Sequence, residues 1–152
     1  DKHARLLPCD RYEMRFEIDF DTPVIGNQVV DFVVDEATFR SDIMAARPFG
    51  FAHEVEALRR AGLARGGSPE NAVVIDGAQI LNTGGLRMER EFVKHKALDA
   101  IGDLYVLGGP LLGRYEGYKA GHAVNNMLVR ELLAHPEAWR EVVRIPDMAM
   151  AG

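Results

Sequence analysis

The chain has only one cysteine, Cys9, and no long apolar segment among its 152 residues. A single cysteine cannot form a disulfide within the chain, which favours a reducing compartment. No stretch approaches the roughly 20 apolar residues needed to cross a bilayer, so we expect no membrane-spanning segment. The polar start, Asp1-Lys2-His3, has neither an initiator methionine nor an apolar leader, so we expect a fragment or a processed chain, although an omitted methionine would give the same start.

Positive charge is also scarce, because 18 Lys and Arg residues stand against 23 Asp and Glu residues. The net charge of −5 gives no general electrostatic reason to bind nucleic acid or an acidic membrane surface, and we expect neither partner. The sequence contains no internal repeat or low-complexity tract. With 47% hydrophobic residues, a chain of this length is sufficient for one domain with a buried core.

Strand patterns come early in the chain. Apolar and polar residues alternate from Tyr12 to Phe20, which predicts a strand with one buried face. A β-rich run from Gln28 to Val34 predicts its hairpin partner across the turn at Gly26-Asn27. Two shorter strands are predicted over residues 72–75 and 79–81.

Helical patterns dominate later. Asp35 is a predicted helix N-cap, and helices are predicted over 38–46, 53–62, 88–107 and from Tyr118 or His122 to Ala134. Strands followed by long helices, without a βαβ repeat, predict an α+β fold. We expect a two-layer sandwich, with a small mixed sheet and two long helices on one face. Residues 1–143 would form this domain and residues 144–152 a tail.

Three polar residues recur at four-residue spacing in the longest predicted helix. His95 and Asp99 lie on one helical face, so an imidazole and a carboxylate can converge there. Both are good zinc ligands, although a solvated or ion-paired helix face explains the same spacing. Asp103 follows one turn later, where a carboxylate can orient a neighbouring histidine or simply face solvent.

A second polar cluster stands at the start of the last predicted helix. His122 follows Gly121, a residue that lets the backbone approach a ligand closely. It could act as a general acid or as an electrostatic clamp, and Lys119 beside it could contact a phosphate. On spacing alone, a structural histidine is the favoured interpretation.

Together these motifs resemble a known enzyme family. The string FVKHKALDAIGD at 92–103, followed by YKAGHAVNN at 118–126, is similar to the signature of the UDP-3-O-acyl-N-acetylglucosamine deacetylases, zinc amidases of lipid A synthesis. The resemblance runs from about Arg11 to Trp139 and is supported by FEIDF at 16–20, RPFGF at 47–51 and the loop Gly66-Gly67-Ser68. It implies that this chain corresponds to the second of the family's two α+β domains.

The resemblance also implies roles for the polar clusters. His95 and Asp99 would be two of the three zinc ligands. His122 would be the catalytic histidine, and Asp103 the carboxylate that orients it. The third zinc ligand and the glutamate general base would lie in the family's first domain, which these residues lack. We therefore expect that domain as a partner, and little or no activity from this chain alone.

Substrate contacts follow from the same resemblance. Lys96 and Lys119 would lie near the sugar and diphosphate of UDP-3-O-acyl-N-acetylglucosamine. Asp19 and Phe20 would form the uridine site, with the ring stacked on uracil. The implied reaction is zinc-dependent hydrolysis of the N-acetyl group with release of acetate, in the cytoplasm of a Gram-negative-type bacterium.

The acyl chain would occupy an insert at about residues 51–81. Phe49 and Phe51 complete the predicted substrate-binding set, and Val55 and Val74 would add apolar surface to a passage for the chain. Judged without the resemblance, apolar residues at these spacings indicate an ordinary core.

One position departs from the family pattern. Pro48 stands where the family usually has a threonine whose hydroxyl contacts the reacting group, and proline has neither a hydroxyl nor a backbone donor. This departure motivates an alternative function, a catalytically inactive module that binds a nucleotide-sugar or an acyl ligand.

Overall fold

The computed structural model describes residues 1–62, 66 and 68–143 of the chain, without the side chains of Leu58 and Arg59. The predicted tail at 144–152 and Gly67 of the predicted loop lie outside the described residues. No helix within the described part is long and apolar enough to cross a membrane.

The main sheet has four strands, whose spatial order is β1 (His3–Leu7), β7 (Gly113–Tyr118), β2 (Tyr12–Asp19) and β3 (Asn27–Val33). The antiparallel pairing of β2 with β3 confirms the predicted hairpin. In contrast, β2 and β7 are parallel, so the sheet is mixed and these two strands end at the same edge.

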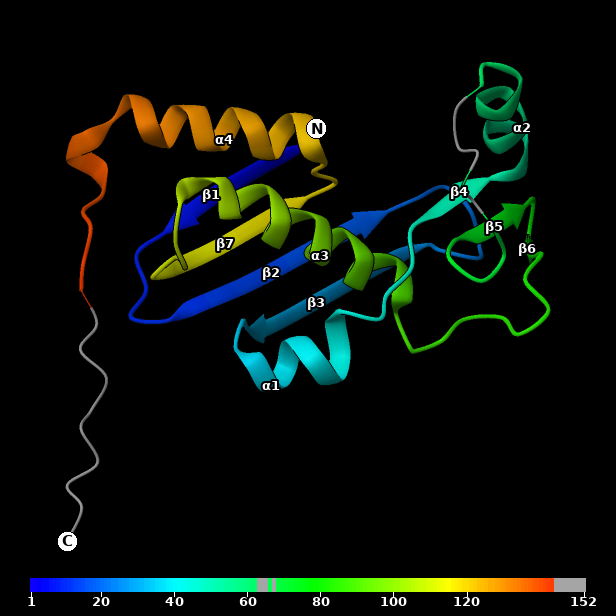
Figure 1. Cartoon of the computed structure of the whole chain (residues 1–152), viewed down its shortest axis with the longest axis horizontal. Coiled ribbons are helices and arrows are strands. Elements are labelled where there is room, and N and C mark those ends of the chain that lie inside the picture. The colour runs from blue at the N-terminus through cyan, green and yellow to red at the C-terminus, as the bar shows by residue number, and fades with distance from the viewer. Residues whose placement is uncertain (63–65, 67, 144–152) are drawn as a thin grey trace, which may run out of the picture.

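Two long helices, α3 (Glu91–Leu104) and α4 (His122–Ala134), lie over one face of this sheet (Figure 1). Alternate β2 side chains face them, and the core between the layers includes the fully or almost fully buried Met14, Phe16, Ile18, Phe92, Val93, Ala97 and Ala100. Burying this apolar surface holds the two layers together. The predicted α+β sandwich is confirmed.

The boundaries of the helices follow local backbone signals. Asp35 caps α1 (Glu36–Thr38) by accepting a 2.7 Å hydrogen bond from the Thr38 N–H, as predicted. The helical path continues through Phe39–Ile43 as a wider turn. α3 begins at Glu91, three residues after the predicted start, because Arg90 has a left-handed φ of 57°.

A second, three-stranded sheet lies beyond one end of the main sheet (Figure 1). Its strands, in spatial order, are β4 (Phe49–Phe51), β5 (Val73–Asp76) and β6 (Gln79–Ile80), and α2 (Ala52–Arg60) follows β4 directly. The predicted strands at 72–75 and 79–81 are therefore present, but they pair with each other and with β4 in a sheet of their own.

The segment before His122 differs from the sequence-based expectation. Tyr118 ends β7, so the last helix begins at His122, the second of the two predicted starts. Glycines occupy two of the three buried positions of β7, Gly113 and Gly117, which conceals the apolar alternation of the strand. A Cβ atom at Gly117 would lie 2.6 Å from the Tyr115 hydroxyl oxygen, so that position requires glycine.

Candidate active site

α3 brings His95 and Asp99 together on its half-buried face. The His95 Nε2 atom lies 3.3 Å from the Asp99 Oδ1 atom, and the two side chains are only 14% and 16% exposed. The His95 Nδ1 atom is 3.1 Å from the carbonyl oxygen of Ala46, which can only accept a hydrogen bond. Nδ1 therefore carries a proton, and Nε2 faces the Asp99 carboxylate.

A buried ion pair holds this carbonyl in place. The peptide group between Ala46 and Arg47 points its C=O at His95 and its N–H at Glu91 Oε1, at 3.0 Å. The Arg47 guanidinium contacts the same carboxylate at 2.8 and 3.1 Å, and Glu91 is fully buried. Burial by itself would raise the pKa of Glu91, but its bonds to Arg47 and to the Arg87 N–H outweigh burial and lower that pKa.

The donors at this point suit zinc in kind. A neutral imidazole nitrogen with its other nitrogen hydrogen-bonded to a carbonyl, beside a carboxylate, is the ligand chemistry that Zn²⁺ prefers. Lys96 donates to the other Asp99 oxygen, Oδ2, at 2.9 Å. Among the described residues, no group of three His, Cys, Asp or Glu side chains could hold a metal ion. His95 and Asp99 supply two donors of the kind that zinc prefers.

His122 and Asp103 form a second pair one turn further along α3. The His122 Nδ1 atom lies 3.0 and 2.9 Å from the two Asp103 carboxylate oxygens. This contact places the proton on Nδ1 and leaves Nε2 available on a side chain that is 66% exposed. The two residues lie side by side as predicted, because the chain bends at Lys119 after β7 and starts α4 at His122 beside the end of α3.

Two further residues adjoin this pair and were not anticipated from sequence. Asn125 donates a 2.8 Å hydrogen bond from Nδ2 to Asp103 Oδ2, and the Tyr115 hydroxyl donates a 2.7 Å bond to Asn125 Oδ1. The sequence did contain a signal for Asn125, because a residue three positions after His122 lies on the same face of a helix and so near this pair. Tyr115 gave no such signal, because β7 was not recognised as a strand.

Asp19 and Lys119, which the resemblance assigned to different parts of the substrate, contact each other. The Lys119 Nζ atom is 2.8 Å from Asp19 Oδ2. This bond holds the pKa of the Asp19 carboxyl below its usual range and raises the pKa of the Lys119 amine. Lys119 has a left-handed φ of 50°, directly after the end of β7. A charged pair thus lies where β2 and β7 both end.

The three predicted substrate-contacting phenylalanines form one cluster. The Phe20 ring centroid lies 5.6 Å from that of Phe49 and 6.4 Å from that of Phe51. Phe49 also contacts the buried Phe92 ring edge-to-face at 5.0 Å. The Lys96 Nζ atom lies 5.7 Å from the Phe49 centroid. These contacts link the aromatic cluster to the same turns of α3 that carry His95.

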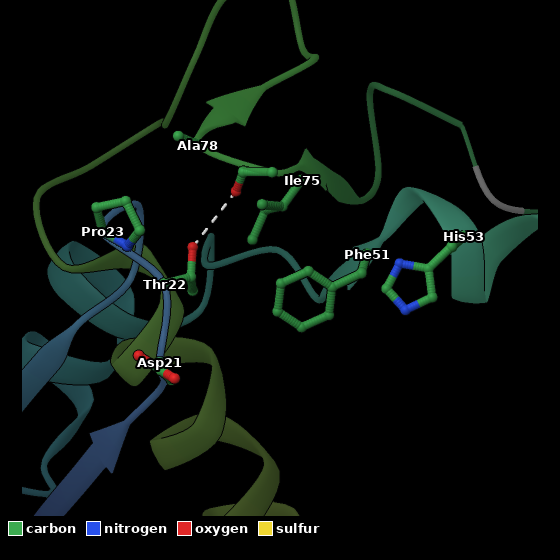
Figure 2. A pocket seen from close by; sticks show the side chains of 8 residues that line it. Asp21, Thr22, Pro23, Phe51, His53, Ile75 and Ala78 are labelled. Atoms are coloured by element: carbon green, nitrogen blue, oxygen red, sulfur yellow. Dashed lines mark hydrogen bonds between the residues drawn. The ribbon is translucent and has the colours of Figure 1, made fainter.

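Two cavities flank β4. One, of about 510 Å³, has mainly apolar walls that include Pro48, Phe49, Val55, Ala72, Val73, Val74 and Leu81. The other, of about 490 Å³, lies between the β2–β3 turn and the β5–β6 turn (Figure 2). There the Phe51 and His53 rings stack with centroids 6.0 Å apart, and the Thr22 hydroxyl donates to the Gly77 carbonyl at 3.4 Å.

Comparison with known proteins identifies the class. The family model for UDP-3-O-acyl N-acetylglycosamine deacetylase matches residues 1–134, so the chain belongs to that family, which confirms the resemblance. The UDP-3-O-acyl-N-acetylglucosamine deacetylase of Phenylobacterium zucineum (strain HLK1) is 59% identical over 151 residues, 99% of this chain and 52% of that protein. The protein of the same name from Pseudomonas entomophila (strain L48) is 51% identical over 153 residues, 99% and 50% respectively. The chain spans about half the length of these relatives.

Proposed function

We propose that this chain supplies one half of the active site of a UDP-3-O-acyl-N-acetylglucosamine deacetylase. The observation that carries the proposal is the placement of two histidines beside one another's helices, His95 on α3 and His122 at the start of α4 in contact with Asp103 of α3. In each ring Nδ1 contacts an acceptor, the Ala46 carbonyl for His95 and the Asp103 carboxylate for His122, so Nε2 is the atom that would ligate or act on the substrate. The names of the relatives support the substrate and the release of acetate, and the family resemblance supports a role of this reaction in lipid A synthesis.

His95 Nε2 and Asp99 Oδ1 would hold a zinc ion. Once bound, Zn²⁺ would lower the pKa of a water molecule and polarise the N-acetyl carbonyl. Ala46 keeps the His95 imidazole in the tautomer that can ligate, and Lys96 offsets the charge on the second Asp99 oxygen. The third ligand and the general base are assigned to the half of the relatives that this chain does not cover.

His122 would act on the reacting group through Nε2. With Nδ1–H bonded to Asp103, the imidazolium form can stabilise the oxyanion or deliver a proton to the departing amine. The Asp103 carboxylate accepts from Nδ1 and so fixes the plane of the ring. Because His122 is exposed in this chain, its Nε2 atom can be approached from the side that the other half would cover.

The substrate would extend from the charged pair to the apolar cavity. Asp19, Phe20 and Lys119 would contact the uridine diphosphate, and Lys96 the sugar. The cavity of about 510 Å³ has the size and walls of a site for an apolar ligand, so the acyl chain would leave water there. The cytoplasmic location expected from sequence remains a prediction, as does the extent of the acyl insert.

The test uses the protein completed by its other half, expressed as one chain. His122→Ala should lower turnover of the N-acetylated substrate by about 10²–10⁴-fold while zinc content is retained. His95→Ala should lose both zinc and turnover. The matched control is His135→Ala, because His135 follows the end of α4 and its ring contacts Glu131 on that helix, away from His95 and His122 in the sequence. Near-normal turnover of the His122 variant would overturn the assignment.

Pro48 supports a second candidate, a module that binds the nucleotide-sugar or acyl ligand without hydrolysing it. Pro48 forms part of the apolar cavity wall and donates no hydrogen bond. In the completed protein, a large rate gain on Pro48→Thr would favour catalysis impaired at this position. No detectable hydrolysis before or after the change, with ligand binding intact, would favour the binding module.

A further inference from the structure

The geometry points to Asn125, held by Tyr115, as a positioning residue that orients the carboxylate of Asp103 for His122. This inference rests on the proposed function, in which His122 transfers a proton. Asn125 lies in the first turn of α4, and Tyr115 lies on β7, so the contact joins the sheet to the end of α3.

Asn125 is fully buried, and both polar ends of its amide are used. Nδ2 donates to Asp103 Oδ2 at 2.8 Å, and Oδ1 accepts from the Tyr115 hydroxyl at 2.7 Å. An ionised carboxylate can only accept, so the amide must present its NH₂ group to Asp103. The Tyr115 hydroxyl reinforces that orientation, because a flipped amide would set two acceptor oxygens against each other and would leave the hydroxyl without an acceptor.

Tyr115 is itself fixed by its surroundings. Its side chain is fully buried, and its ring stacks on Phe16 with centroids 6.0 Å apart. Gly117 leaves the space for the hydroxyl, since an added Cβ there would lie 2.6 Å from it. Burial, and then the charge of Asp103, raise the pKa of Tyr115, so the hydroxyl remains a donor at neutral pH.

The position of the Asp103 carboxylate determines the orientation of the His122 ring. This ring is mostly exposed, and the Asp103 carboxylate is the group that fixes it, through contacts of 3.0 and 2.9 Å. The Oδ2 atom of Asp103 accepts a hydrogen bond from the Asn125 amide and also contacts His122 Nδ1. The amide therefore determines which lone pairs of the carboxylate remain for the imidazole. Asn125 therefore acts through Asp103, without contact to a reacting atom.

Tyr115→Phe is the primary test, because it removes one oxygen and preserves the packing of the ring. Tyr12→Phe is the matched control. The hydroxyl of Tyr12 is also buried, burial likewise raises its pKa, and it has no hydrogen-bond partner among the residues that the structure describes. Asn125→Leu is the stronger variant, since it removes the amide at similar volume.

Two readouts separate positioning from simple stability. Nitrogen-15 NMR of the 152-residue chain should show the neutral His122 ring mainly protonated at Nδ1, and Tyr115→Phe should lower that population. In the completed enzyme, Tyr115→Phe should lower kcat by about 10-fold and Asn125→Leu by up to about 100-fold, with KM and zinc content unchanged. Tyr12→Phe should change none of these.

The inference would be overturned if Tyr115→Phe, once folded, retained both the His122 tautomer and kcat of the parent. Equal losses in the Tyr12 and Tyr115 variants would overturn it as well, since that pattern indicates lost stability alone. Failure of the proposed function gives a different result. In that case His122→Ala would remain active, while the tautomer measurement would still report whether Asn125 orients the pair.

Discussion

Lys119 and Asp19 form an ion pair, with 2.8 Å between Nζ and Oδ2, at the edge of the sheet where the parallel strands β2 and β7 both end. If Lys119 binds a diphosphate, it must share its ammonium group with this carboxylate or leave it. Binding a phosphate at this edge therefore costs the energy of weakening the Lys119–Asp19 ion pair.

Replacing Asp19 by Asn should strengthen the binding of pyrophosphate by about two- to fivefold, because it removes a carboxylate that competes for the half-buried Lys119 ammonium. UDP should gain less than pyrophosphate, since Asp19 is also the predicted contact of the uridine. Calorimetric titration with both ligands measures the difference. A gain that persists after Lys119→Met is added would contradict the role of Lys119.

Glu91→Gln should destabilise the fold strongly, because it leaves the Arg47 guanidinium buried without its counter-charge. Removing one partner of a buried pair typically costs about 3–5 kcal/mol, and Arg47 and Glu91 have side chains only 8% and 0% exposed. Urea unfolding measures the change. The control is Glu36→Gln in the exposed Arg40 pair, which should leave the unfolding midpoint nearly unchanged.

The same pair predicts a pH dependence. Its contacts lower the pKa of Glu91 in the folded chain, whereas an unfolded glutamate titrates near about 4.3. The stabilisation is therefore complete above that value and is lost as pH falls through the lower folded-state pKa. Unfolding midpoints of Glu91→Gln should be less sensitive to acid than those of the parent. Identical acid profiles would show that Glu91 is not responsible.

Zinc should bind this chain weakly, because under the proposed function His95 and Asp99 would supply two ligands, whereas a catalytic site requires three. Competition with a chromophoric chelator at neutral pH measures the affinity, and His95→Ala should abolish the binding, whereas His135→Ala should not. Tight one-to-one binding that requires His95 would instead mean that a third ligand lies within these 152 residues.

Val55→Trp should block the apolar cavity, since Val55 forms part of its wall and lies 3.5 Å from the position of a Cβ at Gly50. In the completed protein, KM should rise for a substrate with a long acyl chain and change little for one with a short chain. Ala37→Trp, at an exposed position of α1, controls for a bulky surface substitution. Equal effects on both substrates would argue against an acyl site here.

Much of the local structure was accessible from sequence. The alternation from Tyr12 to Phe20 and the turn at Gly26-Asn27 specify a hairpin between neighbouring segments, and the apolar period of α3 identifies its buried face. The same period places His95, Asp99 and Asp103 on one stripe, because helical geometry alone brings every fourth residue into line. The family followed from the same short strings.

Long-range pairings were decided by the tertiary structure. β7 has glycine where an apolar residue would have marked a strand, and its parallel pairing with β2 spans about a hundred residues of sequence. The Ala46 carbonyl at His95, the Asp19–Lys119 pair and the Tyr115–Asn125–Asp103 contacts depend on that packing. Sequence periodicity determined which face of each helix or strand is polar and which is apolar. The packing of the apolar faces against each other then determined which polar groups meet. No local sequence pattern encodes the partner of a hydrogen bond between residues far apart in the chain.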